Sequence, residues 1–271
     1  MSGKGVKRAS PGADEEKNPL GEVELSNEDA LRLSDIQKVM QRAEIALERR
    51  AIETLAPKYA ARREVLKAIP KFWAVALMNS PMFSIHAQHH ADQAALSYLE
   101  DLWLVRDPAE TRVFTIEMHF KENPYFKNSV LKKEFKYAPP PGAADETPGE
   151  DGLTDSMIDF NWERDVEGKP FKIDWKDESK TLTKLYPRVA DDSDDDIAES
   201  GSFFHFFERA DDPYDIGVLI GNDIFPDAIE YFLGQRGEID TDDEDSEEED
   251  DDDDDAEEID LEKPRVKRAK H

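Results

Sequence analysis

Carboxylates are the side chains best able to do chemistry in this 271-residue chain. Between Asp240 and Glu258, sixteen of nineteen residues are acidic, and the whole chain has 64 acidic against 35 basic residues, a formal charge of −29. One exposed ion pair contributes only about 0–1 kcal/mol, so such a polyanion binds through many contacts and weakens with salt. It repels nucleic acid and attracts basic proteins or cations. The run therefore predicts a basic protein partner; a solubilising or calcium-buffering tail is the alternative.

Other candidates for catalysis or metal binding are weaker. The chain has no cysteine, which excludes thiol chemistry and disulfides, and it lacks a nucleophile elbow, a phosphate-binding glycine loop, HExxH and a kinase signature. His86, His89 and His90 could share one helix face, but a zinc site needs a further ligand and supporting hydrogen bonds. We interpret them as solvated positions near a helix start. We expect no enzyme activity and no cofactor.

A basic cluster, residues 263–271, follows the acidic run. Such a cluster is suited to nuclear import; a counterion for the neighbouring carboxylates is the alternative. The import residues would be Lys263, Arg265, Lys267, Arg268 and Lys270. The N-terminus lacks the apolar run of a signal peptide, and no stretch approaches the ~20 apolar residues of a membrane span. We expect a soluble nuclear protein without membrane contact, and leave shuttling to the cytoplasm open.

A long helix is predicted over residues 25–79. Ser26 is a suitable N-cap, and apolar residues recur at steps of three and four: Leu33, Ile36, Met40, Ala43 and Leu47, with Leu55 further along. We expect a kink at Pro57 and an interruption at Pro70. A rod of ~50 residues, ~75 Å long, cannot bury this stripe against a small body alone, so a second copy is the simplest partner. Two shorter helices in a monomeric core are the alternative.

The rest of the folded part is predicted to be α+β. We expect a short helix near 92–104, antiparallel strands at 114–120 and 131–137, a loop over 138–152, and further strands at 158–162 and 171–175. Ser202 is expected to cap a helix rich in buried phenylalanines, and a last helix covers about 226–233. The predicted organisation is a disordered leader (1–24), a dimerisation helix (25–79), a body (80–236), a disordered acidic tail (237–262) and the basic cluster (263–271).

Five sequence blocks resemble the nucleosome assembly protein family. In chain order they are AIPKFWAVALMNSP (68–81), FKENPYFKNSVLKKEF (120–135), IDWKDESKTLTK (173–184), SFFHFF (202–207) and NDIFPDAIEYFL (222–233). The ENPYF and NSP elements are most similar to its SET, or template-activating, branch. The resemblance spans roughly residues 25–235 plus the acidic tail.

This resemblance implies a kinked dimerisation helix joined in each protomer to an α+β "earmuff" domain. It implies a histone chaperone that binds and shields one or both core histone pairs and promotes nucleosome assembly and disassembly. The implied antiparallel dimer seam runs from Leu33 to Leu55 along the stripe. The implied histone contacts on the earmuff are Asp211, Asp212 and Asp215, with Asp223 as second choice. Those in the tail are Asp242, Asp243, Glu244, Asp245, Glu247, Glu248, Glu249 and Asp250.

The resemblance also carries an alternative and two departures. Members of the SET branch are associated with phosphatase inhibition and with masking histones from acetylation, so an acidic regulatory inhibitor with a phosphatase or acetyltransferase partner is the alternative function. The segment 138–170 is longer than is usual in that branch. The loop 191–196 is acidic where some relatives are basic, so we expect little direct nucleic-acid binding.

Overall fold

The fold begins with one long helix. The computed structural model describes residues 25–190, 197–199 and 201–236. Helix α1 spans Asn27–Leu66. The Oγ of Ser26 accepts a hydrogen bond from the Asp29 amide at 3.1 Å, which confirms the predicted N-cap, and Glu28 and Asp29 lie in the first turn, where the helix dipole favours acidic side chains.

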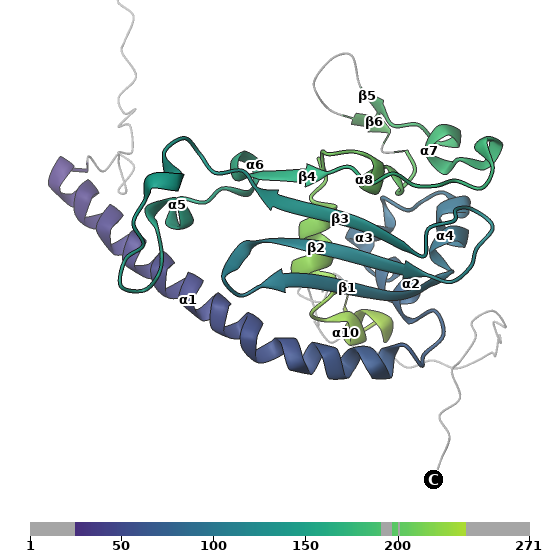
Figure 1. Cartoon of the computed structure of the whole chain (residues 1–271), viewed down its shortest axis with the longest axis horizontal. Helices are drawn as coiled ribbons and strands as arrows, with labels where there is room; N and C mark the ends of the chain where they lie inside the picture. Colours follow the sequence, from purple (N-terminus) through teal and green to yellow (C-terminus); the bar gives the residue numbers. More distant parts are fainter. Residues whose placement is uncertain (1–24, 191–196, 200, 237–271) are drawn as a thin grey trace, which may run out of the picture. The chain divides into compact units, whose positions relative to one another are not determined.

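Helix α1 continues through Pro57 without a break, although its course bends part-way along (Figure 1). It ends at Leu66, well before the predicted end at residue 79. Two residues explain the early end: Pro70 disfavours helical backbone in the residue before it, and Lys71 adopts a left-handed conformation with φ of 60°. The chain turns there, so the next helix, α2 (Phe72–Met78), packs in the core with Phe72, Trp73 and Leu77 buried.

A four-stranded antiparallel meander forms the centre of the body (Figure 1). Its strands are β1 (Leu99–Asp107), β2 (Glu110–Phe120), β3 (Val130–Tyr137) and β4 (Val166–Lys169). Strands β2 and β3 confirm the predicted pair. The short helices α2, α3 (Pro81–Ser84), α8 (His205–Glu208) and α10 (Ala228–Phe232) pack behind one face of the sheet.

The predicted helix over 92–104 is wrong. Helix α4 covers only His90–Leu96, and the residues from Leu99 onward form β1. The pairing of β1 with β2 shifts between Leu99 and Asp101, so its buried leucines at 99, 102 and 104 are not evenly spaced. The steps of three from Leu96 to Leu99 and from Leu99 to Leu102 therefore resemble a helical pattern.

The strands predicted at 158–162 and 171–175 are also wrong. Residues near the first form helices α5 (Asp155–Ile158) and α6 (Trp162–Asp165), and the second makes only one bridge, between Trp175 and Phe126. The edge strand β4 instead lies between the two predicted ranges and includes Gly168. A Cβ there would come within 2.1 Å of the carbonyl oxygen of Ala210, so this glycine allows the 209–212 segment to cross the sheet edge.

Short elements complete the body. They are the 3-10 turns η1 (Ala143–Asp145) and η2 (Glu178–Lys180), helix α7 (Leu182–Leu185), the ribbon of β5 (Val189–Ala190) with β6 (Ile197–Glu199), helix α9 (Ile216–Val218) and the π-helix η3 (Leu219–Ile224).

The aromatic block after Ser202 is part of the core, as predicted. Phe203, Phe204, Phe206 and Phe207 are all at most 2% exposed, although α8 itself is only one turn long. The last helix, α10, confirms the one expected near residues 226–233. The architecture is therefore the α+β class predicted, with a long helix followed by an antiparallel sheet and helices. No described helix is long and apolar enough to span a membrane.

Candidate functional site

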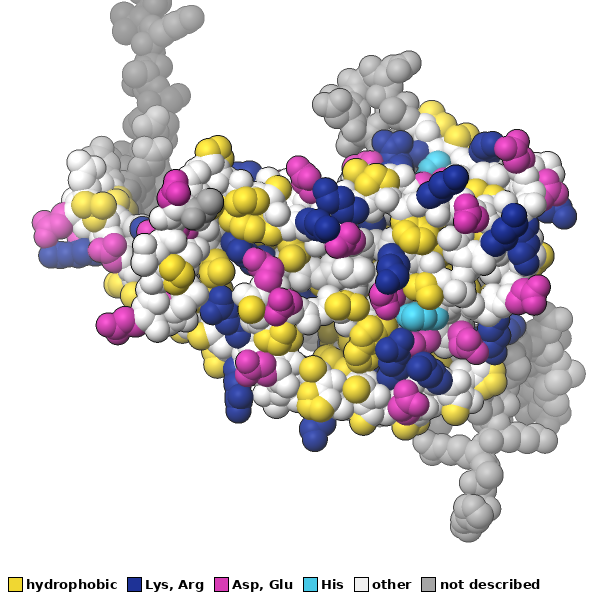
Figure 2. Space-filling view, viewed as in Figure 1, with side chains coloured by type: hydrophobic (Ala, Val, Ile, Leu, Met, Phe, Trp, Pro, Cys, Tyr) yellow, Lys and Arg dark blue, Asp and Glu magenta, His cyan; other side chains and the backbone are white. Residues whose placement is uncertain are grey.

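Negative charge is unevenly divided along the chain. The described residues contain 35 acidic and 26 basic side chains, a net charge of −9, so the other −20 of the total −29 belongs to residues outside the described ranges. The tail carboxylates from Asp242 to Asp250, the import cluster at 263–271 and the acidic loop 191–196 all lie outside the described residues. On the face seen in Figure 2, Lys and Arg side chains are interspersed with Asp and Glu.

Three of the predicted contact residues lie on one segment between α8 and α9, in three different environments. Asp211 is paired with the guanidinium groups of Arg209 (2.9 Å) and Arg188 (3.0 Å); burial would raise its pKa, but these bonds hold the pKa below its usual value. Asp212 accepts the backbone amides of Ile216 and Gly217, and burial raises its pKa. Asp215 is exposed with φ of 52° and makes no ion pair with another described residue. Of the three, Asp215 is the most available to a partner.

A buried lysine on the sheet is hydrogen-bonded to the backbone just before this segment's first aspartate. Lys133 on β3 is 0% exposed, and its Nζ donates to the carbonyl oxygens of Arg209 (2.8 Å) and Ala210 (3.1 Å). Burial lowers its pKa to about 8. The conformation of the acidic segment therefore depends on a residue of the sheet.

Asp223 lies in a second acidic group on the C-terminal helices. The group consists of Asp223, Asp227 and Glu230, and each carboxylate pairs with a different nitrogen of Arg236, at 2.9, 2.9 and 3.2 Å. Asp223 also accepts the hydroxyl of Tyr231 at 2.7 Å. A cationic partner at this site must compete with Arg236.

Sequence reasoning missed Asp227, Glu230 and Arg236. Positions 223, 227 and 230 are four and three residues apart, the spacing that places side chains on one helix face, and this was the signal that could have found the acidic group. The pairing with Arg236 depends on the chain folding back after α10, and local spacing does not report such a turn.

Five of the six predicted dimerisation residues are on the solvent-exposed side of α1, and the sixth, Leu55, is partly exposed where the helix faces β1. Leu33, Ile36, Met40 and Leu47 are 54%, 59%, 59% and 70% exposed, and Leu55 is 40% exposed. Ala43, between them, is exposed as well. The opposite side of the helix contacts its own body, for example through Arg42, which is bonded to Asp151 at 2.9 Å. A contiguous apolar stripe of this kind is rarely left exposed and marks an interaction surface.

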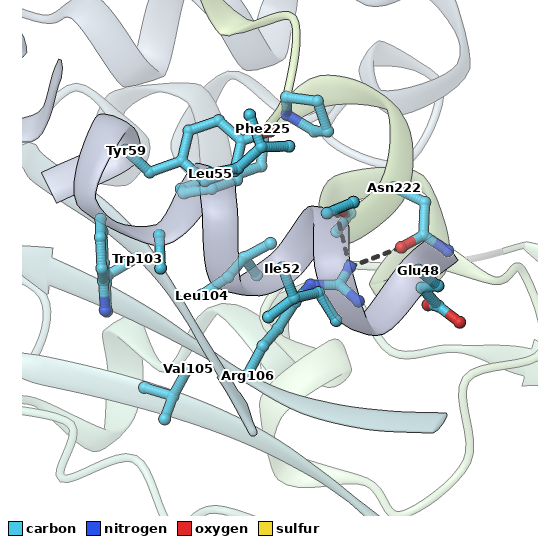
Figure 3. A pocket seen from close by; sticks show the side chains of 14 residues that line it. Glu48, Ile52, Leu55, Tyr59, Trp103, Leu104, Val105, Arg106, Asn222 and Phe225 are labelled. Atoms are coloured by element: carbon cyan, nitrogen blue, oxygen red, sulfur yellow. Dashed lines mark hydrogen bonds between the residues drawn. The ribbon is translucent and has the colours of Figure 1, made fainter. Parts of the chain in front are cut away.

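A cavity of about 490 Å³ lies between α1, β1 and the π-helix. Its walls are mostly apolar and include Leu55, Tyr59, Trp103 and Phe225 (Figure 3). At one end the guanidinium of Arg106 donates to the carbonyl oxygen of Gly221 (3.0 Å) and to Oδ1 of Asn222 (2.6 Å). We refer to this cavity as the α1–β1 groove.

The histidine group differs from the prediction. His86 is buried against Tyr214 and His89 stacks on Tyr186 with ring centroids 3.9 Å apart, so only His90 is an exposed position near a helix start. The interpretation as three solvated side chains was wrong, because the turns around α3 direct the first two rings toward aromatic neighbours. Within the described part of the chain, no three His, Asp or Glu side chains converge as metal ligands would.

Comparison with known sequences decides the family. A sequence profile described as "Nucleosome assembly protein (NAP)" matches residues 20–235. The chain belongs to this family. The match covers α1 and the whole described body, and it confirms the resemblance on which the sequence interpretation depended.

Individual proteins of the NAP family share about 30% sequence identity with this chain. Nucleosome assembly protein 1-like 1 of Xenopus tropicalis is 29% identical over 202 residues, which cover 65% of this chain and 48% of the relative. Nucleosome assembly protein 1-like 4 of Homo sapiens is 31% identical over 203 residues, covering 64% and 50%. The chain thus spans about half the length of the curated relatives it matches. These relatives carry the NAP 1-like name, and the assignment to the SET branch stays a prediction.

Solved structures share the fold. The crystal structure of Ccp1 superposes with a TM-score of 0.57 at 23% identity, covering 77% of this chain and 96% of that chain. The crystal structure of Vps75 gives a TM-score of 0.55 at 17% identity, covering 78% and 100%. At these identities the likeness establishes the NAP fold of the described residues and nothing more.

Proposed function

We propose that this NAP-family protein is a histone chaperone, which binds core histones, shields their charge and promotes nucleosome assembly and disassembly without catalysis. The observation that carries the proposal is the family match across residues 20–235. The net charge of −29 supplies the physical reason, because a polyanion attracts the basic surface that histones otherwise present to DNA. The proposed cargo is one or both core histone pairs.

The proposed mechanism is competition for histone cations. The tail carboxylates Asp242 to Asp250 provide many weak, exchangeable contacts, and Asp215 provides a carboxylate on the folded body. Asp211 and Asp223 are already paired with arginines, so histone arginine or lysine would replace those partners. Exposed pairs of this kind are worth little individually, which makes the exchange reversible. DNA, with its denser charge, then recovers the histones.

The proposed working unit is a homodimer that pairs the exposed stripes of two α1 helices. Two acidic bodies held at a fixed spacing would bind one histone complex at two points, and the second contact then forms at a high effective concentration. The location we propose is the nucleus, reached through the 263–271 cluster.

Phosphatase inhibition and acetylation masking stay as alternatives from the sequence. No contact among the described residues favours either. A phosphatase assay with and without histones would separate inhibition from chaperoning.

The experiment is a histone-binding titration on the full chain. The test variant replaces every Asp and Glu from 240 to 258 with Asn or Gln, which keeps the length of the tail but removes its charge. The dissociation constant for core histones should rise at least tenfold, a loss of about 1.4 kcal/mol, and its salt dependence should decrease. Affinity that responds neither to salt nor to this replacement contradicts the electrostatic mechanism.

A further inference from the structure

A pocket of about 250 Å³ lies beside the acidic segment of residues 211–215. It is bounded by that segment, by the sheet edge at β3 and β4, and by α6. Its lining combines two aromatic rings, Phe135 and Trp162, with four carboxylates and no basic side chain. We refer to it as the β4–α9 pocket. Apolar walls with a few charged groups around them match a ligand that has an apolar body and a cationic end.

The aromatic part of the pocket is held in place by packing. Trp162 stacks on Phe114, with ring centroids 5.5 Å apart and ring planes inclined by 24°, and its centroid lies 5.2 Å from that of Phe135. Phe135 is buried, whereas Trp162 is only partly buried. An aromatic face attracts a cation placed within about 6 Å of its centroid. The indole is therefore an ordered surface on which a cationic side chain can lie.

The four carboxylates differ in their partners within the protein. Asp211 is paired with two arginines, and the two oxygens of Asp212 accept two backbone amides. Glu163 and Asp215 are exposed, and their carboxylates make no hydrogen bond or ion pair with another described residue. Lys133, under the segment, is bonded to two backbone carbonyl oxygens instead. Two carboxylates of the pocket are thus available to a cation from a partner.

The arrangement favours an ammonium over a guanidinium. A guanidinium is planar and binds best to one carboxylate through two parallel hydrogen bonds. Both oxygens of Asp212 are already used by amides, and Glu163 and Asp215 come from different segments. An ammonium is a compact charge whose three donors point in different directions. The aliphatic stem of a lysine can in addition lie along the apolar wall.

We propose that the β4–α9 pocket receives a single lysine side chain of a histone, with the stem against Trp162 and Phe135 and the ammonium held by the carboxylates of Glu163 and Asp215. The inference rests on the proposed function and names the chemistry of one contact on the body. It adds Trp162 and Glu163 to the histone contacts. Both belong to the segment 138–170, from which the sequence predicted no contact.

A small probe tests the pocket without histones. The full chain is labelled with 5-fluorotryptophan, which gives one fluorine signal for each of its four tryptophans, and Trp162→Phe assigns the signal of Trp162. Nα-acetyl-lysine methylamide at millimolar concentration should shift this signal in a saturable way. The Nε-acetylated form of the same compound should not, because acetylation removes the charge.

Two results of this titration would overturn the proposal. The absence of a shift with the lysine compound overturns the pocket as a lysine site. An arginine methylamide that shifts the Trp162 signal at lower concentration than the lysine compound overturns the choice of an ammonium. The signal of Trp162 reports only its own surroundings, so lysine that binds to carboxylates elsewhere on the chain does not contribute.

Paired variants test whether histones use the pocket. Glu163→Gln with Asp215→Asn removes two charges from its lining. Glu167→Gln with Asp159→Asn is the matched control, because it removes two exposed charges that lie outside the lining. General attraction changes equally in both. The dissociation constant for core histones should rise roughly tenfold in the pocket variant and less than about twofold in the control.

Failure of the inference is distinguishable from failure of the proposed function. Equal losses of affinity in the pocket variant and the control, in a chain that still binds histones, overturn the lysine pocket alone. A chain that binds no histones overturns the function on which the inference rests. Urea unfolding of both variants confirms that a loss of affinity comes from the pocket and not from a loss of fold.

Discussion

Asp92 has no exposed surface, yet both of its oxygens are used. One accepts the hydroxyl of Ser202 at 2.6 Å and the other accepts the amide of Phe203 at 2.9 Å. The carboxylate thus joins α4 to the start of the aromatic block. Burial raises its pKa, because desolvation disfavours the charged form.

Two substitutions of Asp92 should separate the contribution of its hydrogen bonds to stability from the contribution of its charge. Asp92→Ala leaves a buried amide and hydroxyl without partners and should lower the free energy of unfolding by roughly 2–4 kcal/mol. Asp92→Asn can keep the bond from the Phe203 amide through its Oδ1, and its Nδ2 can donate to Oγ of Ser202 in a bond of reversed direction, so it should cost clearly less. Urea unfolding of the three proteins measures this, and equal losses in the two variants would contradict the role of the bonds.

The pH dependence of the same variants has a definite sign. The native carboxyl group keeps its proton at pH values where the unfolded chain has lost it, so its contribution to stability falls as pH rises through the window above the unfolded pKa. Asp92→Asn has no such group. As pH is lowered from neutral into that window, wild type should gain stability relative to Asp92→Asn, and a pH-independent difference would contradict this.

The contribution of Lys133 to stability should change with pH in the opposite direction to that of Asp92. Its pKa falls to about 8 by burial, so the native state binds fewer protons than the unfolded state between about 8 and the ordinary lysine value. Wild type should therefore gain stability relative to Lys133→Met as pH rises through this range, by at most about 3 kcal/mol. The matched control is Lys132→Met, since Lys132 is half exposed and pairs with Glu117 at 2.7 Å. Thermal unfolding from pH 7 to 10 compares them, and equal pH profiles for both variants would contradict the assignment.

At the residue scale the sequence predicted the kinds of side chain but not their partners. The carboxylates at 211, 212, 215 and 223 lie on the folded body, and their role as histone contacts stays a prediction. Asp212 accepts the backbone amides at the start of α9, and Asp223 pairs with Arg236. Both contacts form because the chain reverses direction, and residue type does not encode such reversals.

At the scale of elements, the proposed dimer depends on α1. Its stripe is apolar and exposed along a helix that contacts its own body only on the other side. Periodicity predicted this helix, its cap and its exposed stripe, because those features depend on neighbours three and four residues away. It failed at β1, where an irregularity in strand pairing produced a helical spacing of leucines, and at β4, which depends on a glycine that lets another segment approach.

Substitution on the stripe should break the dimer. Burial of a leucine contributes about 1.5–3 kcal/mol, and Leu47→Asp removes two of them from a symmetric dimer, so the dissociation constant should rise at least 100-fold. Leu31→Asp is the matched control, because Leu31 is also exposed on α1, at 68%, but lies off the stripe. Sedimentation equilibrium measures both, and equal effects would mean that the stripe is not the seam.

At the scale of the whole molecule, function depends on how charge is divided. The described residues together carry −9 and the remaining residues −20. Composition alone predicted that the partner is positively charged, and the sequence blocks shared with the family predicted the architecture. Neither could predict that most carboxylates on the folded body are already paired with arginine or lysine, since that pairing arises only after folding.

In the function proposed above, two copies of this chain pair through α1 and capture core histones in competition with nucleic acid. Light scattering of the full chain in dilute buffer, alone and mixed with each core histone pair, tests it most directly. The expected mass is twice 30.9 kDa for the protein alone. With histones we expect a heavier complex that still contains two chains and that dissociates in salt. A single 30.9 kDa chain that leaves both histone pairs unbound would contradict it.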